Sequence, residues 1–129
     1  MKLINKERLD AVAEKAKLSE RLRRNDNFHD SLEESVQRLL NALEVGTVIP
    51  IHRHQNTAET YILLRGELHV VFYNAEKVET DRFILNPTTE DYGIDVPAGQ
   101  WHTLEVIRPS VLFEIKKGPY CPFQPEDLL

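Results

Sequence analysis

Three histidines and one glutamate are the residues best suited to chemistry. His52 and His54 are two positions apart, Glu59 follows five positions later, and His102 lies much further along the chain. On a β-strand, residues two apart face the same side and lie about 6–7 Å from each other, so both imidazoles could reach one ion. If Glu59 and His102 also project inward, the four side chains converge on a divalent metal. Imidazole and carboxylate ligands suit zinc, iron, manganese or nickel.

The four ligands leave the role of the ion open. On an octahedral ion they would leave two adjacent positions for water, a substrate or dioxygen. On a tetrahedral zinc they would close the site and make it structural. The residue types do not choose between these arrangements.

The segments that must carry these residues differ on the two sides of residue 44. We predict an N-terminal helix and loop over residues 1–44, a β-barrel over 45–117 and an extended tail over 118–129. Apolar residues at helical spacing indicate the first helix, with Asn5 as its cap. The polar residues 23–30 are predicted to form a loop. Residues 36–43 could be either a second short helix or a strand, because short apolar runs do not settle the period.

Beyond residue 44 the apolar runs are short and turn residues separate them. Residues 59–64, 68–73, 94–96, 101–107 and 111–116 are predicted strands, with turns at 65–67, 74–77, 86–88, 97–99 and 108–110. Many short strands at this spacing are typical of an antiparallel sandwich or jelly roll. The fold class predicted is mainly β, in a single domain with an N-terminal helical segment.

The composition limits the partners and the cellular location that we expect for the protein. The chain has 129 residues, a net charge of −5 and one cysteine, Cys121, so no internal disulfide can form. The acidic balance argues against nucleic acid as a partner. No apolar run is long enough to cross a membrane. We therefore expect a cytoplasmic protein with a small-molecule ligand, and a homodimer, because open sheet edges often pair with a second copy.

The spacing of the ligand residues resembles the two motifs of the cupin superfamily. The first motif is matched by Gly46, His52-Arg53-His54, Glu59 and Gly66, and the second by Pro97-Ala98-Gly99 and His102. Two positions depart from the second motif: Gly93 is too close to the proline, and Val106 replaces an asparagine that is not a ligand. The resemblance implies a double-stranded β-helix, the cupin jelly-roll barrel, with the metal held by His52, His54, Glu59 and His102.

A longer set of motifs resembles the WbuC-type cupin-fold metalloproteins of bacterial O-antigen gene clusters. The matching residues are Arg23-X-Asn25-X-Asn27-X-His29, 36–42, Pro50-X-His52-Arg53-His54, Trp101-His102-Thr103 and Glu114-X-Lys116-X-Gly118-Pro119-Tyr120. This resemblance implies a role in polysaccharide or sugar metabolism without supplying a reaction.

Other polar residues are candidates for ligand contact. Tyr61 should face inward beside Glu59 and is a candidate acid–base residue, as is His29. His29 and its neighbouring asparagines form either a solvated loop or a flap over the barrel mouth. Arg53 is expected at the surface, and the charged face of the strand bearing Glu114 and Lys116 is expected to be the outer one. The predicted substrate-binding residues are Arg23, Asn25, Asn27, Arg38 and Trp101.

Three functions are compatible with these residues. The first is a metal-dependent isomerase or oxygenase that acts on a small sugar-derived or carboxylate substrate. The second is a binding module that holds such a molecule without turnover. The third is a scaffold with a structural zinc site. Because the cupin fold serves many chemistries, the fold cannot choose among them.

Overall fold

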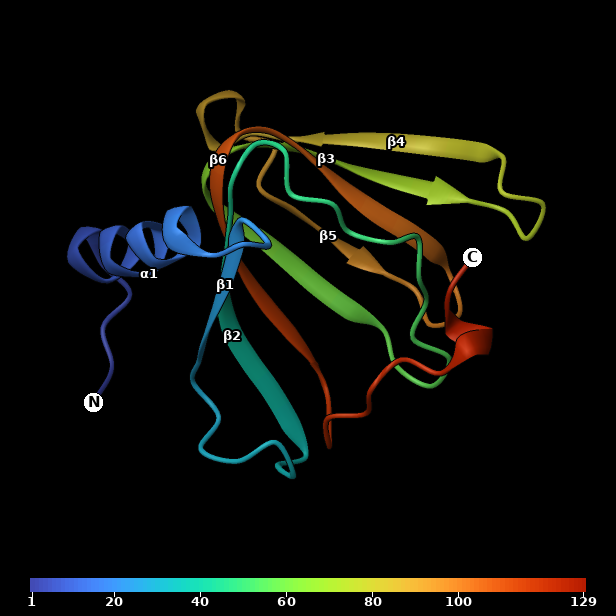
Figure 1. Cartoon of the computed structure of the whole chain (residues 1–129), viewed down its shortest axis with the longest axis horizontal. Coiled ribbons are helices and arrows are strands. Elements are labelled where there is room, and N and C mark those ends of the chain that lie inside the picture. Colours follow the sequence, from blue (N-terminus) through green and yellow to red (C-terminus); the bar gives the residue numbers. More distant parts are fainter.

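The computed structural model describes the whole chain, Met1–Leu129, and its first element is the helix α1 (Lys6–Leu18). The Asn5 side chain accepts a hydrogen bond from the backbone N–H of Arg8, which confirms the predicted cap. One face of α1 packs against the sheet in a buried apolar cluster: Leu9, Val12, Ala16, Leu40, Ala42 and Val111. The helix therefore covers one face of the sheet (Figure 1).

Six strands form the rest of the framework. They are β1 (Arg23–Asn27), β2 (Val36–Leu43), β3 (Glu59–Tyr73), β4 (Glu79–Leu85), β5 (Gly93–Val96) and β6 (Trp101–Lys117), with short 3-10 helices at Pro87–Thr89 and Pro125–Asp127. All pairings are antiparallel. The strand order is β1-β2-β6-β3-β4, and β5 pairs with the first part of β3 (Figure 1).

The two long strands β3 and β6 bend, and this bend closes the barrel. The first part of β3 pairs with β5 and with the second part of β6, whereas its second part pairs with β4 and with the first part of β6. The register shifts between Leu63 and Leu68, where Gly66 has a φ of 96°. A Cβ on Gly66 would collide with Ser110 Oγ and with the backbone oxygen of Pro109. Only glycine allows the two strands to approach this closely at the bend.

The main apolar core fills the space between the two bent halves of the sheet. It consists of Leu43, Tyr61, Leu63, Leu68, Val70, Phe72, Leu85, Val96, Leu104 and Leu112. Buried residues alternate over the first part of β3, at Glu59, Tyr61 and Leu63, as the strand pattern predicted, whereas residues 70–72, 102–104 and 110–112 are buried in runs of three. These findings confirm the predicted fold class, a mainly β, single-domain jelly-roll barrel with an N-terminal helix.

Some predicted elements differ from the observed ones. Residues 23–27 form an edge strand instead of a loop, and the strand alternative for 36–43 is correct. The turns predicted at 65–67 and 108–110 are irregularities within continuous strands. Strand β4 was not predicted because only its last residue, Leu85, is buried, so it has no apolar alternation.

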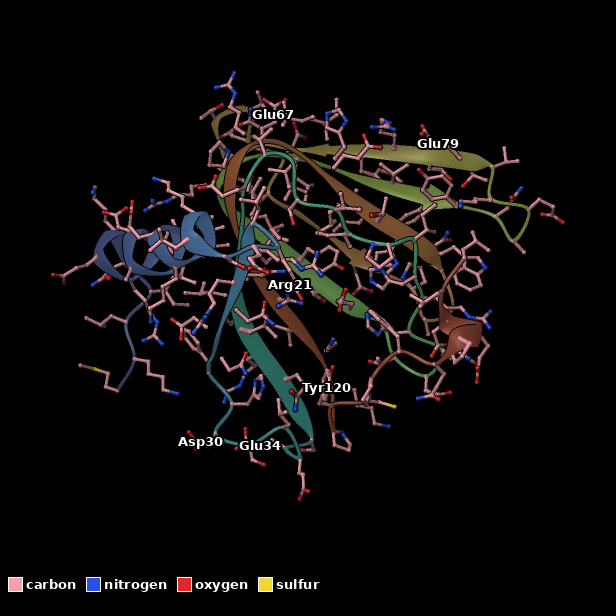
Figure 2. The ribbon with its side chains drawn as sticks, viewed as in Figure 1. Arg21, Asp30, Glu34, Glu67, Glu79 and Tyr120 are labelled. Carbon is pink, nitrogen blue, oxygen red and sulfur yellow. The ribbon has the colours of Figure 1, made fainter.

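The C-terminal segment after Lys117 lies against the barrel. The backbone N–H of Gly118 bonds to the oxygen of Ser35, and that of Leu129 bonds to the oxygen of Ile51. Figure 2 shows Tyr120 at the same end of the molecule as Asp30 and Glu34, whereas Glu67 and Glu79 lie at the opposite end. No helix in the structure combines the length and apolar character needed to cross a bilayer.

Candidate metal centre

Backbone pairing brings the candidate ligands together from distant parts of the chain. His52 and His102 form an antiparallel bridge, with each backbone N–H bonded to the other's oxygen at 3.0 and 2.9 Å. On its other side, His102 pairs with Phe72 in the second part of β3. Glu59 begins β3 and pairs with Val96 of β5 and Lys116 of β6. The histidine pair and the glutamate therefore come from the two halves of the bent sheet.

The four predicted ligand residues converge. One ligand atom from each of His52, His54, Glu59 and His102 lies within 4.8 Å of every other. His54 Nε2 is 3.2 Å from Glu59 Oε2, and His102 Nε2 is 3.6 Å from Glu59 Oε1. All except His54, which is partly exposed, are buried.

Hydrogen bonds to the backbone fix the tautomers of two of the imidazoles. His52 Nδ1 lies 2.8 Å from the oxygen of Pro50, and His102 Nδ1 lies 2.9 Å from the oxygen of Gln100. Because a carbonyl oxygen can only accept, both Nδ1 atoms must carry a proton, so the neutral form of each ring has its lone pair on Nε2. The hydroxyl of Tyr61 lies 3.1 Å from His102 Nε2 and can donate to it.

The protonation states also suit a cation. Burial, together with the nearby His102, lowers the pKa of His52 to about 4, so this imidazole is neutral at pH 7. Burial alone would raise the pKa of Glu59, but His102, His54 and Lys116 hold it well below its ordinary value. The centre therefore presents the carboxylate of Glu59 beside the neutral imidazole of His52.

This donor set fits a metal ion. The Oε1 atom of Glu59 is buried without any hydrogen-bond partner. Lone pairs on nitrogen and a carboxylate oxygen face each other in a buried space, which is costly unless a cation lies between them. His52, His54, Glu59 and His102 could therefore hold one ion, with mixed nitrogen and oxygen ligands that several divalent metals accept.

A second set of polar residues extends from the centre along the inner face of the sheet. Tyr61 pairs with Glu114, and Asn41 Nδ2 donates to Glu114 Oε1 at 2.9 Å. Burial, and to a lesser extent Glu59, raises the pKa of Glu114 to about 7. The expectation that Glu114 and Lys116 lie on the outer face is wrong, because Lys116 Nζ is 3.6 Å from Glu59 Oε2.

The register of β1 and β2 separates the predicted substrate-binding residues into two groups. Asn25 pairs with Asn41 and therefore shares its inner face, and Arg23 and Asn27 alternate with it on the same side. Arg23 Nη1 donates to the backbone oxygen of Val48, so it links β1 to the loop between β2 and β3. Arg38 lies on the opposite face from Asn41 and does not reach the interior, so the structure does not bring it to the site.

His29 and Trp101 also lie apart from the four ligand residues. The ring of His29 is buried against the backbone of Arg38, with Nδ1 3.0 Å from both the Arg38 nitrogen and the Arg38 oxygen. The His29 ring is therefore held against β2, and this position gives no support to an acid–base role for it. Trp101 precedes His102, and its ring packs under the guanidinium of Arg53 at 4.4 Å.

The C-terminal tail and the loop of residues 53–57 form the walls of a cleft of about 600 Å³ beside the centre. The ring of Phe123 lies 4.8 Å from that of His52 and 5.5 Å from that of His54. His54 and Lys116 both line the cleft, so the ligand cluster has an open side. Figure 1 shows the C-terminal 3-10 helix next to the loop that precedes β3. The spacing of the histidines could not reveal this contribution from the tail.

Several solved structures, a cupin domain among them, resemble this chain. A conserved protein of unknown function from Streptococcus pyogenes matches with a TM-score of 0.62 at 13% identity, covering 93% of this chain and 90% of that one. The cupin domain of Cnp3 from Schizosaccharomyces pombe matches with a TM-score of 0.59 at 14% identity, covering 74% of this chain and 64% of that one. An oxalate decarboxylase from Bacillus subtilis, which has Mn(II) centres, matches with a TM-score of 0.56 at 22% identity, covering 69% of this chain and 23% of that one.

These likenesses establish the cupin fold and no more, because all three identities are low. The chain spans less than a quarter of the length of the oxalate decarboxylase and about two thirds of the yeast domain. Among curated proteins, none matches the sequence. Residues 4–85, which include three of the four candidate ligands, match the sequence model of a family described as a domain of unknown function, DUF6016, and the chain belongs to that family.

Proposed function

We propose that this protein is a metal-dependent cupin of the WbuC type that binds and transforms a sugar-derived or carboxylate small molecule in bacterial polysaccharide metabolism. The observation that carries the proposal is the convergence of four ligand atoms within 4.8 Å beside an open cleft. The polysaccharide setting is supported by the sequence motifs alone.

A catalytic or ligand-binding role is favoured over a structural zinc site because the centre is not fully enclosed. The His54 side chain is 16% exposed and lines the cleft, so a small molecule could approach from that side. A structural site has no need of such access. The manganese of the oxalate decarboxylase is one precedent for a metal in this fold.

Different parts of the site would activate the ligand, donate a proton and exclude water. A bound divalent ion would supply Lewis acidity for a carbonyl or carboxylate oxygen. Tyr61 is the candidate proton donor, because burial, followed by the nearby carboxylates, holds its pKa well above its ordinary value and keeps the hydroxyl protonated. Its oxygen lies 3.1 Å from His102 Nε2, at the inner side of the centre. Phe123 and the tail would exclude water from the side that they cover.

Elemental analysis of the purified protein tests the proposal. We expect about one equivalent of a divalent metal in the parent protein and a sharp loss in His52→Ala and His102→Ala. His69→Ala is the matched control, because His69 interacts with Arg82, outside the cluster. Cobalt substitution followed by visible spectroscopy would then detect an exchangeable water.

Two results would contradict the proposal. Normal metal content in both ligand variants would show that the four residues do not hold the ion. A four-coordinate cobalt spectrum that no added small molecule changes would favour a closed structural site.

A further inference from the structure

We infer that the cleft beside the metal centre selects an anionic small molecule, with Lys116 and Arg53 as the residues that recognise its negative group. This inference rests on the proposed function and deepens it, because it specifies the charge of the ligand. Neither residue was expected at the site from the sequence.

The position of Lys116 is the first observation. Its Nζ atom lies 3.6 Å from Glu59 Oε2, and its side chain is only 20% exposed. The same lysine lines the cleft. It therefore connects the carboxylate of the centre with the space that a ligand would occupy.

Charge balance is the second observation. A divalent ion would add two positive charges beside Lys116, while the carboxylate nearest to both is the single one of Glu59. Glu114 does not line the cleft, and its carboxylate is engaged by Asn41. Excess positive charge in a largely buried space is unfavourable unless an anion enters. A negative ligand would provide that compensation.

Arg53, which also lines the cleft, supplies the third observation. Its guanidinium is held over the Trp101 ring, and its side chain is 29% exposed and lines the cleft. Arginine presents several donors in a fixed plane that matches carboxylate and phosphate oxygens. A pre-positioned and partly exposed guanidinium is therefore suited to an incoming anion.

The acidic residues of the cleft do not cancel these cations. Asp127 accepts hydrogen bonds from the Gln55 side chain and from the backbone N–H of Gln124, and it lies 3.9 Å from Arg53 Nε. Glu126 is exposed. Asp127 thus holds the tail and orients Arg53, while the partly exposed guanidinium of Arg53 and the side chain of Lys116 still line the cleft.

Binding of small probes to the metal-loaded protein tests the inference. The probes are malonate, inorganic phosphate and malonamide, the last being a neutral analogue of malonate. Trp101 is the single tryptophan of the chain and packs under Arg53, so its fluorescence reports on the cleft. We expect malonate or phosphate to bind at least tenfold more tightly than malonamide. The stronger of the two anions identifies the ligand as a carboxylate or a phosphate.

Two neighbouring lysines provide a matched pair of variants. Lys116→Gln should weaken anion binding at least tenfold, whereas Lys117→Gln, which removes the same charge from an exposed side chain that lines the same cleft but forms no ion pair with Glu59, should weaken it less than threefold. Lys116→Arg should restore most of the affinity. Lys116→Gln should also bind the metal more tightly than the parent, because a cation that competes for Glu59 is gone. Replacing a lysine that had only a structural role would not change the affinities for the anion and for the metal in opposite directions.

The possible outcomes distinguish a failure of this inference from a failure of the proposed function on which it rests. A parent protein that takes up no metal refutes the proposed function. A metal-loaded protein that binds malonamide as tightly as both anions refutes the anionic ligand alone. Equal losses in Lys116→Gln and Lys117→Gln refute the assignment to Lys116, because a general effect of positive charge would explain them.

Discussion

Replacing Glu114 with glutamine should make the metal-free protein more stable at neutral pH. The carboxyl of Glu114 is buried and its pKa is about 7, against an ordinary value of 4.5. Below pH 4.5 both the folded and the unfolded chain carry the proton, and Glu114 imposes no ionisation cost. As the pH rises towards 7, the unfolded chain releases the proton while the folded chain retains it, so stability is lost.

The size of the effect follows from the difference between the two pKa values. Each pKa unit corresponds to about 1.36 kcal/mol, so a difference of about 2.5 units costs about 3 kcal/mol by pH 7 to 8. Glutamine has nearly the same shape and does not ionise. The free energy of unfolding of Glu114→Gln relative to the parent should therefore increase by about 3 kcal/mol between pH 4.5 and pH 8.

Urea denaturation at a series of pH values measures this difference. The protein should be treated with a chelator first, because a bound cation would favour the ionised carboxylate. Glu76→Gln is the control for loss of one negative charge, since Glu76 lies in an exposed turn. A difference between Glu114→Gln and the parent that stays constant with pH would refute the reasoning.

Three further predictions concern the bend, the histidine pair and the tyrosine. Gly66→Ala should lower the free energy of unfolding in urea denaturation by more than about 2 kcal/mol, because the added Cβ collides with the backbone of Pro109 and Ser110. Gly99→Ala should lower it less, since nothing lies within 4 Å of a Cβ at that position. In the metal-free protein, His52 should add a slope to the pH profile that amounts to a loss of up to about 3 kcal/mol as the pH falls from 6.5 to 4, because the unfolded chain protonates His52 while the folded chain, with a pKa of about 4, resists protonation. This slope is opposite in sign to that of Glu114, so it is measured as the difference between the parent and His52→Gln in urea denaturation. His52→Gln should remove that slope, and an unchanged pH profile would count against it. Tyr61→Phe should keep its metal content in elemental analysis and lose about 1 kcal/mol of stability, and a loss of metal would mean that the hydroxyl supports the ligands directly.

The ligand residues were predictable because their chemistry and spacing are local signals. The strand assumed for His52 and His54 does not form, because His52 makes only an isolated bridge and His54 lies in the adjoining loop, but both imidazoles still reach the centre. Glu59 opens a strand, as predicted. The helix was predictable for the same reason, since one apolar face and an asparagine cap lie within 14 residues.

The elements that the sequence did not reveal depend on contacts with distant residues. Strand β1 contains only polar residues and exists because it pairs with β2. The inward direction of Lys116 depends on the register of β6 against β3, which a shift of one residue would reverse. The cleft depends on hydrogen bonds between the tail and residues 51–55, and nothing in the local composition specifies them.

The ladder between His52 and His102 has a consequence for how the centre discriminates among cations. Two ligands whose peptide groups are hydrogen-bonded to each other cannot easily spread apart or move closer. Glu59 is likewise fixed between two neighbouring strands. His54 lies in the adjoining loop, with a more exposed side chain, and is the member best able to adjust. Ions of different radius would therefore be accommodated mainly by movement of one imidazole, and selectivity should respond to changes in the 53–57 loop more than to changes in the barrel.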